Sequence, residues 1–372
     1  MRETRLRAGV VGAGLMGRWH ADAISRVGGC VAAIADPDIA RAHALARRHP
    51  GAHATTDLET ALHSGKLDVV HICTPIETHL LLTRSALAAG CHALVEKPLV
   101  ETANETGELL EMARVVGRLV CPVHQFVFQP GVRGALAELP HIAPLLHVDA
   151  TACSAGAEPG GASVDQPGGC EGGSSSGRGA SMNGDSRRDA IALDIFPHAL
   201  SLLARVTDGD IGELEWRVDR PCAGEWRAST ESGGATVSLT ISMAGRPTTN
   251  QLRLIGARGT VHVDLFHGFA IREGPSVSRA RKLTQPFAHG AKTLAAASGN
   301  LLRRAARRER AYPGLRELVL RFHAAAASGF QPPLSAKEIL AVARARDAIR
   351  RAANDASNAH GAARLLLPAH GS

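Results

Sequence analysis

The strongest constraint on the fold of this chain is a glycine motif near its N-terminus. From Val10 to Gly17 the sequence VVGAGLMG places G-x-G-x-x-G directly after a short apolar run and at the start of an amphipathic segment. In such a motif the first glycine permits a tight turn, the second lets the backbone approach a pyrophosphate, and the third allows a helix to pack closely on a strand. The motif therefore predicts a strand, a phosphate-binding turn and a helix whose N-terminal amides face the phosphate.

A carboxylate stands where dinucleotide binding requires one. Asp36 ends the next apolar run, roughly 20 residues beyond the last glycine, where it can accept hydrogen bonds from the adenosine ribose. Its charge would repel a 2′-phosphate, so NAD is favoured over NADP, although Arg41 and Arg47 stand nearby. The alternative is a helix-starting turn followed by an aspartate cap, with no nucleotide. The intact spacing favours the nucleotide.

The first third of the chain alternates short apolar runs with helical patterns, which is typical of a parallel sheet wound with helices. We therefore predict an α/β fold whose N-terminal domain, residues 1–123, is a Rossmann doubly wound parallel sheet that binds NAD. The predicted strands span Leu6–Val11, Cys30–Ala35, Val69–Cys73, His92–Val95 and Leu119–Val123. The predicted helices span Met16–Val27, Ile39–Arg48, Glu77–Ala89 and Thr102–Val116.

The pattern changes after Val123, and residues 124–355 are predicted to form a second, α+β domain for substrate binding and oligomerisation. Alternating runs in this part predict a largely antiparallel sheet. Glycine and small polar residues dominate from about 154 to 186, so we expect a flexible insertion there, and a frayed tail over 356–372. The expected strands are Leu145–Ala152, Ile211–Val218, Ala235–Ser242, Thr249–Ile255 and Thr260–Phe266, and the expected helices are Ala190–Ala204, Leu315–Ala326 and Ser335–Ala353.

Composition narrows the class of protein further. With 372 residues the chain exceeds what one core usually organises, and no apolar run is long enough to cross a bilayer, so we expect a cytoplasmic protein of two domains. The seven cysteines include no Cys-x-x-Cys pair and the histidines show no metal-ligand spacing, so no metal is expected. The net charge of +7 is dispersed except from Arg303 to Arg310, a run interpreted as a solvated helix face. Neither nucleic acid nor a membrane is an expected partner.

Two further segments carry a family resemblance. Residues 74–79 read TPIETH, and residues 88–99 read AAGCHALVEKPL, with Glu96-Lys97-Pro98 after the predicted fourth strand of the domain. With these motifs the chain resembles the glucose-fructose oxidoreductase/inositol dehydrogenase (Gfo/Idh/MocA) family of oxidoreductases. The resemblance extends from the glycine motif to the last two helices, apart from the Gly/Ser-rich insertion.

The resemblance implies a set of site residues. In the family the lysine of the Glu-Lys-Pro motif lies beside the nicotinamide, and a later Asp-x-x-x-His on a helix completes the catalytic set. The matching catalytic residues here are Lys97, Asp194 and His198. The cofactor-binding residues predicted from the motif and the resemblance are Gly12, Gly14, Leu15, Met16, Gly17, Asp36, Thr74, Pro75, His79, Glu96, Lys97 and Gln125.

The chain also departs from the family pattern. Arg188-Asp189-Ala190 stands where the family usually has a glycine run before the helical aspartate. Phe196 replaces a small residue and Ser201 replaces a common aspartate, while Val127 stands where an arginine is frequent. These changes predict an unusual substrate pocket and leave the substrate unassigned.

The chemistry implied by the resemblance is hydride transfer. Oxidising a secondary alcohol needs a base within hydrogen-bond reach of the hydroxyl that loses its proton. His198 is the candidate base, Asp194 one helical turn earlier could orient it or hold substrate, and Lys97 would stabilise the developing alkoxide. Outside the resemblance, an aspartate and a histidine at this spacing are often a surface pair, and a lysine before a proline is often a solvated loop residue.

The resemblance therefore implies an NAD-dependent oxidoreductase that transfers hydride between nicotinamide and the secondary alcohol or ketone of a sugar, cyclitol or similar polyhydroxylated molecule. It also implies a homodimer or homotetramer. Two alternatives stay open: a non-catalytic NAD(P)-binding sensor or regulator, and an NAD-dependent glycosidase of the same fold. Net formation of NADH separates the first function from the other two.

Overall fold

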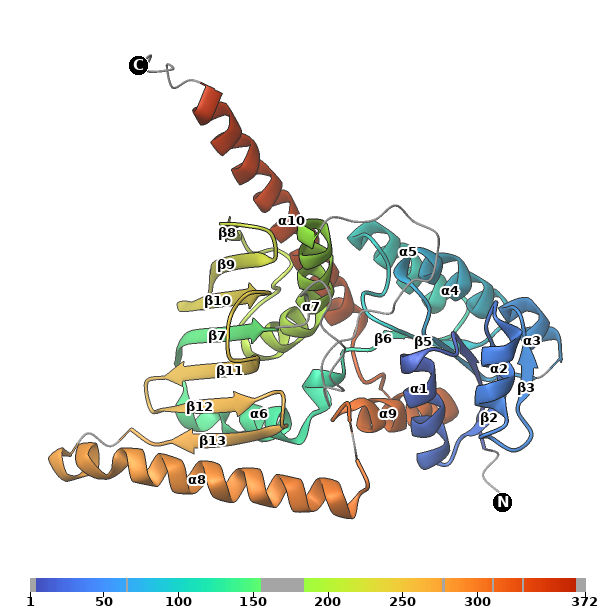
Figure 1. Ribbon diagram of the computed structural model, residues 1–372, viewed down its shortest axis with the longest axis horizontal. Helices are drawn as coiled ribbons and strands as arrows, with labels where there is room; N and C mark the ends of the chain where they lie inside the picture. Colours follow the sequence, from blue (N-terminus) through green and yellow to red (C-terminus); the bar gives the residue numbers. More distant parts are fainter. Residues whose placement is uncertain are drawn as a thin grey trace. The chain divides into compact units, whose positions relative to one another are not determined.

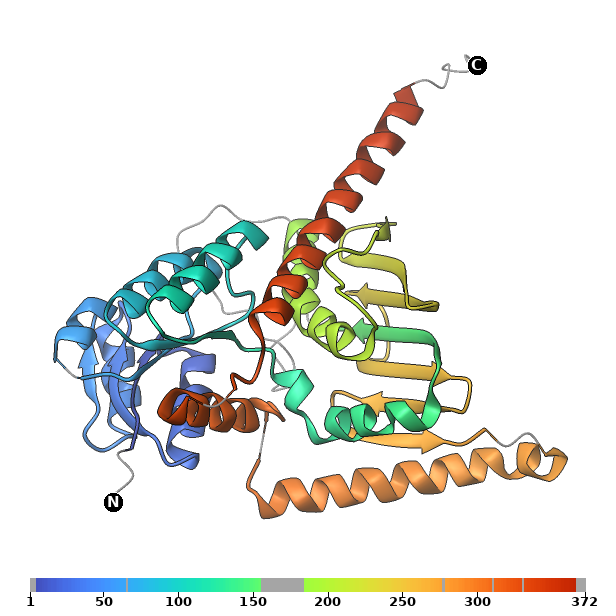
Figure 2. The same cartoon turned by 180° about the vertical axis from the view of Figure 1, so that it is seen from behind.

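The computed structural model describes residues 5–64, 66–154, 184–275, 278–309, 311–329 and 331–365 (Figures 1 and 2). The described chain divides into two compact units. The first contains the residues up to Phe128 together with Tyr312–Ala343, and the second contains those from Gln129 to Ala311 and from Arg344 onward. The insertion expected at about 154–186 lies almost wholly outside the described residues.

The first unit contains a six-stranded parallel sheet with the strand order β3-β2-β1-β4-β5-β6. Its central strands are almost continuously apolar and buried, as expected for strands covered by helices on both faces. This arrangement confirms the predicted Rossmann sheet. The strands are β1 (Arg7–Val11), β2 (Cys30–Ala35), β3 (His53–Thr55), β4 (Val69–Ile72), β5 (His92–Val95) and β6 (Val120–Pro122).

The helices between these strands begin at recognisable caps. The Asp38 side chain accepts hydrogen bonds from two backbone N–H groups of the first turn of α2, and Thr102 and Glu105 form a capping box at α5. The short elements β3 and α3 were not predicted, because three and seven residues show little periodicity. The helices are α1 (Leu15–Arg26), α2 (Ile39–Ala46), α3 (Leu58–Ser64), α4 (His79–Ala88) and α5 (Ala103–Val115).

A helix from the far end of the chain completes the first unit. Helix α9 (Leu315–Ser328) packs against α1, with Leu318 and Phe322 fully buried, and Trp19 meets Tyr312 edge to face at 5.5 Å. In Figures 1 and 2, α4 and α5 lie on one face of the sheet, and α1 and α9 on the other. The predicted boundary placed all of 124–355 in the second domain. In the structure, Tyr312–Ala343 belongs to the first unit instead. The sequence could not show this, because amphipathic spacing indicates that one face of a helix is buried but not which element buries it.

The second unit contains a seven-stranded mixed sheet with the order β13-β12-β11-β7-β10-β9-β8. Most neighbours are antiparallel, as predicted, but β7 and β10 pair in parallel. The sequence prediction missed β9 and β13. The strands are β7 (Leu145–Cys153), β8 (Arg217–Asp219), β9 (Glu225–Ser232), β10 (Ala235–Ser242), β11 (Thr249–Gly256), β12 (Gly259–Asp264) and β13 (Phe269–Glu273).

One predicted strand is wrong over most of its length. Ile211–Val218 was expected to be extended, but only its last two residues belong to β8. Gly209, with a φ of 95°, and Asp210, which accepts a hydrogen bond from the N–H of Gly212, instead form a turn. Ile211 is buried at this turn, so its apolar character reflects packing and not a strand.

Three helices of the second unit, and a fourth at the C-terminal end, differ in how well they were predicted. Helices α6 and α7 pack on the sheet and on each other, and α8 lies along β13. Helices α6 and α8 were not among the predicted helices, α7 begins six residues before its predicted start, and α10 continues beyond its predicted end. The bounds are α6 (Pro130–Ile142), α7 (Gly184–Val206), α8 (Arg279–Ala306) and α10 (Ala336–Leu365), which begins in the first unit.

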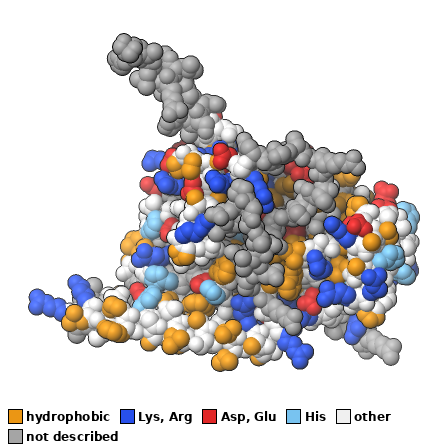
Figure 3. Space-filling model, in the orientation of Figure 1, with side chains coloured by type: hydrophobic (Ala, Val, Ile, Leu, Met, Phe, Trp, Pro, Cys, Tyr) orange, Lys and Arg blue, Asp and Glu red, His pale blue; other side chains and the backbone are white. Residues whose placement is uncertain are grey.

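Helix α8 presents apolar side chains to solvent. Leu283, Phe287 and Leu294, spaced four and seven residues apart, are 69–80% exposed. The side of α8 that packs on its own unit instead carries His289 and Asn300. Figure 3 shows hydrophobic side chains along this helix at the lower edge of the view. In the described part of the chain, no helix combines the length and apolar character needed to cross a bilayer.

Candidate active site

The glycine turn joins β1 to α1. Gly12 has a φ of 94°, and a Cβ at this position would lie 2.6 Å from the carbonyl oxygen of Cys73. A Cβ on Gly17 would lie 1.8 Å from the carbonyl oxygen of Gly12, so only glycine permits this close approach of helix and turn. At Gly14, the N-cap of α1, an added Cβ would meet no described atom within 4 Å. The turn is thus tightly packed on its inner side and open at Gly14, where a pyrophosphate would need space.

Asp36 ties this turn to the end of β2. The side chain is buried, and one carboxylate oxygen accepts a hydrogen bond from the Ala13 N–H at 2.8 Å. The other oxygen accepts one from the Asp38 N–H at 2.9 Å. Each carboxylate oxygen can accept a further hydrogen bond, so Asp36 can both support the turn and accept a ribose hydroxyl.

The loop after β4 is held by His79. The His79 side chain is buried, with Nε2 at 2.8 Å from the Thr74 carbonyl oxygen and Nδ1 at 2.9 Å from the Pro98 carbonyl oxygen. It therefore joins the loop after β4 to the loop after β5, and both of its ring nitrogens face backbone rather than open space. Beside it, the Thr78 hydroxyl lies 2.7 Å from that of Thr74, and Pro75 precedes a short 3-10 turn.

Glu96 and Lys97 follow β5 directly. Glu96 is buried, and its Oε2 accepts the backbone N–H of Lys97 at 3.2 Å while its Oε1 lies 3.1 Å from His20 Nε2. Burial by itself would raise the pKa of Glu96, but the His20 hydrogen bond and the positive charges of His20 and Lys97 outweigh it and lower the pKa. Burial, with a smaller effect of the Glu96 charge, raises the pKa of the neighbouring Cys73 thiol. Glu96 is thus a buried carboxylate and Cys73 a protonated thiol.

Gln125 opens a 3-10 turn, Gln125–Phe128, after β6. The side chain is buried, and its Oε1 has no hydrogen-bond partner among the described residues. A buried amide oxygen in this state is costly unless another group donates to it. Together with the open space at Gly14, this acceptor means that the residues present fit a dinucleotide with an amide or hydroxyl donor. Val127 on the same turn is also buried. At this position, where the family often has an arginine, the side chain contributes to the apolar core instead.

Asp194 and His198 lie on α7 in the second unit. His198 is buried, Asp194 is half-buried, and the Ser201 hydroxyl donates to the His198 carbonyl oxygen at 2.8 Å. Phe196 packs edge to face on Trp226 at 5.2 Å, which explains a large residue at this position.

The unusual start of α7 also has a structural role. The Asp189 carboxylate accepts hydrogen bonds from Arg220 Nη2 at 2.7 Å and from the Gly224 N–H at 2.9 Å. These contacts anchor the helix to the loop between β8 and β9. Arg188-Asp189-Ala190 therefore replaces a flexible glycine run by a fixed helix start.

The predicted site residues of the first unit gather at one edge of its sheet. They follow the carboxyl ends of β1, β2, β4, β5 and β6, and the strand order reverses between β1 and β4, where such sheets bind ligands. The catalytic residues are divided, because Lys97 belongs to the first unit and Asp194 and His198 to the second. The residues gathered in the first unit are Gly12, Gly14, Leu15, Met16, Gly17, Asp36, Thr74, Pro75, His79, Glu96, Lys97 and Gln125.

Comparison with known proteins agrees with this geometry. The profile of an oxidoreductase family with an NAD-binding Rossmann fold, Gfo/Idh/MocA, matches residues 6–124. Inositol 2-dehydrogenase of Leifsonia xyli subsp. xyli is 44% identical over 115 residues, which are 30% of this chain and 34% of that protein. D-glucoside 3-dehydrogenase of Escherichia coli is 32% identical over 126 residues, 32% of this chain and 35% of that protein. Residues 6–124 of the chain thus match the Gfo/Idh/MocA family.

The match to the Gfo/Idh/MocA profile identifies residues 6–124 as an NAD-binding Rossmann domain. The matched segment spans about a third of the length of these curated relatives. For the whole chain, UDP-N-acetylglucosamine 3-dehydrogenase from Acidithiobacillus ferrooxidans shares the fold, with a TM-score of 0.68 and 18% identity over 95% of this chain and 99% of that one. The second unit therefore shares its fold with the corresponding part of this dehydrogenase.

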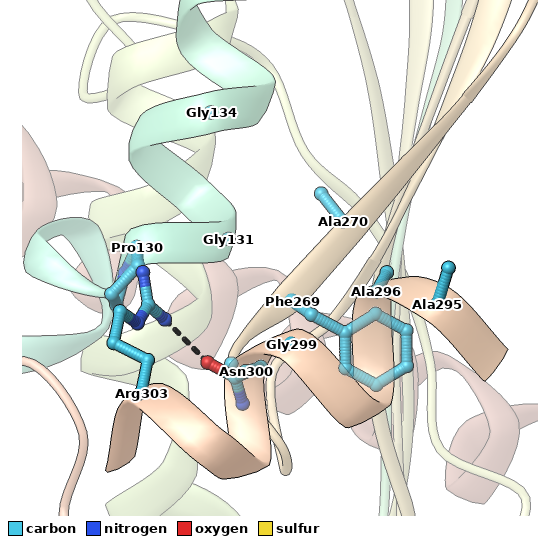
Figure 4. A pocket seen from close by; sticks show the side chains of 11 residues that line it. Pro130, Gly131, Gly134, Phe269, Ala270, Ala295, Ala296, Gly299, Asn300 and Arg303 are labelled. Carbon is cyan, nitrogen blue, oxygen red and sulfur yellow. Dashed lines mark hydrogen bonds between the residues drawn. The ribbon is translucent and has the colours of Figure 1, made fainter. Parts of the chain in front are cut away.

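A cavity of about 280 Å³ lies elsewhere, between α6, β13 and α8 of the second unit. Figure 4 shows that Gly131 and Gly134 from α6 and Phe269 from β13 line it, with Asn300 and Arg303 of α8 at one side. None of the predicted site residues contributes to its lining. Its lining is mostly small residues, among them Ala295, Ala296 and Gly299 of α8.

Proposed function

We propose that this chain is an NAD-dependent dehydrogenase that oxidises a secondary alcohol of a sugar, cyclitol or similar polyhydroxylated molecule, or reduces the corresponding ketone. The observation that carries the proposal is the arrangement of the first unit. There, an open Gly-rich turn and the Glu96-Lys97 pair follow strands of one sheet and end at the same edge. Relatives named inositol 2-dehydrogenase and D-glucoside 3-dehydrogenase support the substrate class.

In this proposal each residue of the first unit has a stated task. The N–H groups at Gly14 and the start of α1 bind the pyrophosphate, and Asp36 accepts the adenosine ribose hydroxyls. The negative charge of Asp36 favours NAD over NADP. Gln125 Oε1 accepts a donor of the nucleotide, which satisfies its buried oxygen. When bound, NAD supplies the hydride acceptor.

The catalytic roles follow from what alcohol oxidation requires. The substrate hydroxyl gives its proton to a base, for which we propose His198, with Asp194 one helical turn earlier orienting the ring or the substrate. The ammonium of Lys97 stabilises the negative charge that develops on the substrate oxygen. Glu96 supports Lys97 through its charge and its hydrogen bond to the backbone. The enzyme is proposed to act in the cytoplasm as a homodimer or homotetramer.

The test begins with binding and then screens substrates. Purified protein is titrated with NADH, NAD and NADPH by calorimetry, and then incubated with NAD and a panel of inositols, glucosides and free sugars while NADH absorbance is recorded. We expect NADH binding and net NADH formation with at least one member of the panel. Lys97→Ala should retain NADH binding and lose turnover, whereas Lys337→Ala, at an exposed position of α10, should keep both. Absence of binding to either redox form would refute the proposal.

A further inference from the structure

Three histidines form a buried chain inside the first unit. They come from three separate elements: His20 from α1, His71 from β4 and His323 from α9. His20 Nδ1 lies 2.8 Å from His71 Nδ1, and His71 Nε2 lies 2.9 Å from His323 Nε2. The side chains of His20 and His71 are 0% exposed, and that of His323 is 6% exposed. His323 is therefore the outer end of the chain.

The inner end of the chain is the Glu96 carboxylate. Glu96 Oε1 lies 3.1 Å from His20 Nε2, and Glu96 Oε2 accepts the Lys97 N–H. The rings meet nitrogen to nitrogen along a line, and no group of three or more His, Cys, Asp or Glu residues in the described chain is placed to hold a metal ion. The chain is thus a path of hydrogen bonds from α9 to the residue next to the proposed catalytic lysine.

An ionised carboxylate at one end restricts where the protons lie. Because Glu96 can only accept, His20 Nε2 carries a proton in every arrangement that satisfies this contact. If His20 is neutral, its Nδ1 accepts from His71 Nδ1–H, and His71 Nε2 then accepts from His323 Nε2–H. If His20 is an imidazolium, its Nδ1–H donates to His71 Nδ1, and His71 Nε2–H donates to His323 Nε2. Both arrangements satisfy every hydrogen bond of the chain.

The two arrangements differ by one proton. A proton that binds His323 Nδ1 releases the Nε2 proton of His323 to His71 Nε2, and His71 in turn releases its Nδ1 proton to His20 Nδ1. The result is an imidazolium at His20 against the Glu96 carboxylate, and neutral rings at His71 and His323. The reverse sequence returns the proton to solvent, so each step breaks one N–H bond and forms another.

We propose that His71 and His323 are positioning residues through which His20 takes up and releases a proton, so that the charge beside Glu96 and Lys97 is set from the outer end of this chain. The charged and titratable groups that face the inner end are Glu96, Lys97 and the Cys73 thiol. When His20 is neutral, Lys97 stands beside a full negative charge. When His20 is protonated, that charge is compensated, and the ammonium of Lys97 is less stabilised.

The surroundings of the outer rings agree with this role. Burial, and then the charges of His20 and His323, hold the pKa of His71 well below its ordinary value. Burial, and then the charge of His20, lowers the pKa of His323 to about 4. Burial thus opposes a positive charge on either of these two rings.

The test is ¹⁵N NMR of histidine-labelled protein over the pH range in which the chain stays folded. We expect His20 to gain its second N–H with the same midpoint at which His71, without any change of charge, switches from the Nδ1–H to the Nε2–H tautomer. His323→Phe should abolish the switch of His71, and His43→Gln, at an exposed position of α2, should leave it unchanged. If His323→Phe does not fold, His323→Gln should retain both tautomers of His71 but exchange them more slowly.

The proposal is overturned if His71 keeps one tautomer while His20 gains a proton, or if His20 never gains one. These outcomes do not depend on turnover. The predicted effect on catalysis does rest on the proposed function: the pH profile of kcat should follow the His71 switch, with an unchanged KM for NAD. If no substrate is oxidised while the switch is observed, only the proposed function fails.

Discussion

Acid should destabilise the first unit through His323, and the size of the effect can be worked out. The pKa of His323 falls from its ordinary value of 6.5 to about 4 because the ring is buried, with a smaller contribution from the charge of His20. Between these two pKa values the unfolded chain binds a proton that the folded chain does not. Stability is therefore complete above the unfolded pKa and is lost as the pH falls toward the folded one.

The magnitude follows from the ratio of the two binding polynomials. At about pH 5, protonation of this imidazole favours the unfolded state over the folded state by a factor of about thirty. This factor corresponds to about 2 kcal/mol of lost stability. His323→Gln retains an N–H that can donate to His71 Nε2 but cannot titrate. Acidification from pH 7 to about pH 5 should therefore cost the wild-type unit about 2 kcal/mol more than it costs this variant.

Hydrogen exchange followed by mass spectrometry measures this difference. The peptides that cover β4 and β5 report opening of the first unit alone, after correction for the intrinsic dependence of exchange on pH. His43→Gln, on the exposed side of α2, is the matched control and should behave as the wild type. Equal losses of protection in the wild type and in His323→Gln would refute the depressed pKa of His323.

Four further perturbations address the cofactor and catalytic sites. Gly14→Ala should fold as the wild type, because its Cβ meets nothing within 4 Å, yet weaken NADH binding more than about tenfold, or 1.4 kcal/mol, by filling the pyrophosphate space. Gly17→Ala should instead destabilise the unit by more than about 2 kcal/mol, seen as a lower urea midpoint, because its Cβ would meet the turn. Asp36→Ala should weaken NADH binding about ten- to hundredfold and reduce the preference over NADPH, measured by calorimetry; unchanged affinity would exclude a ribose contact. Lys97→Ala should lower kcat about a hundredfold to ten-thousandfold with NADH affinity preserved, and undiminished turnover would contradict its role.

The predictions from sequence were most accurate where local pattern and tertiary role coincide. β2 and β5 match the predicted ranges residue for residue, because a strand buried on both faces must be continuously apolar. The glycine turn could be predicted equally well, because the positive φ of Gly12 and the close contact at Gly17 permit no residue type other than glycine.

The prediction failed where a residue's role depends on distant partners. Nothing local in Leu315–Ser328 shows that this helix packs on the first sheet. His79 stays a predicted cofactor-site residue, but the contacts of both its ring nitrogens with backbone oxygens could not be read from the sequence. His71 offered a signal that was not used: a histidine inside an otherwise apolar strand needs a buried partner. Its two partners, His20 and His323, are 51 and 252 residues away, beyond the reach of any periodicity argument.

The return of the chain to its first unit has a consequence for engineering. A fragment that stops after β6 would lack α9, and the face of α1 against which α9 packs would be exposed to water. An exchange of nucleotide-binding domains between relatives must therefore transfer two separate segments of the sequence, the N-terminal segment and the segment that contains α9. A chimera made at a single junction would combine the transferred domain with the recipient's own α9, whose side chains are complementary to a different α1.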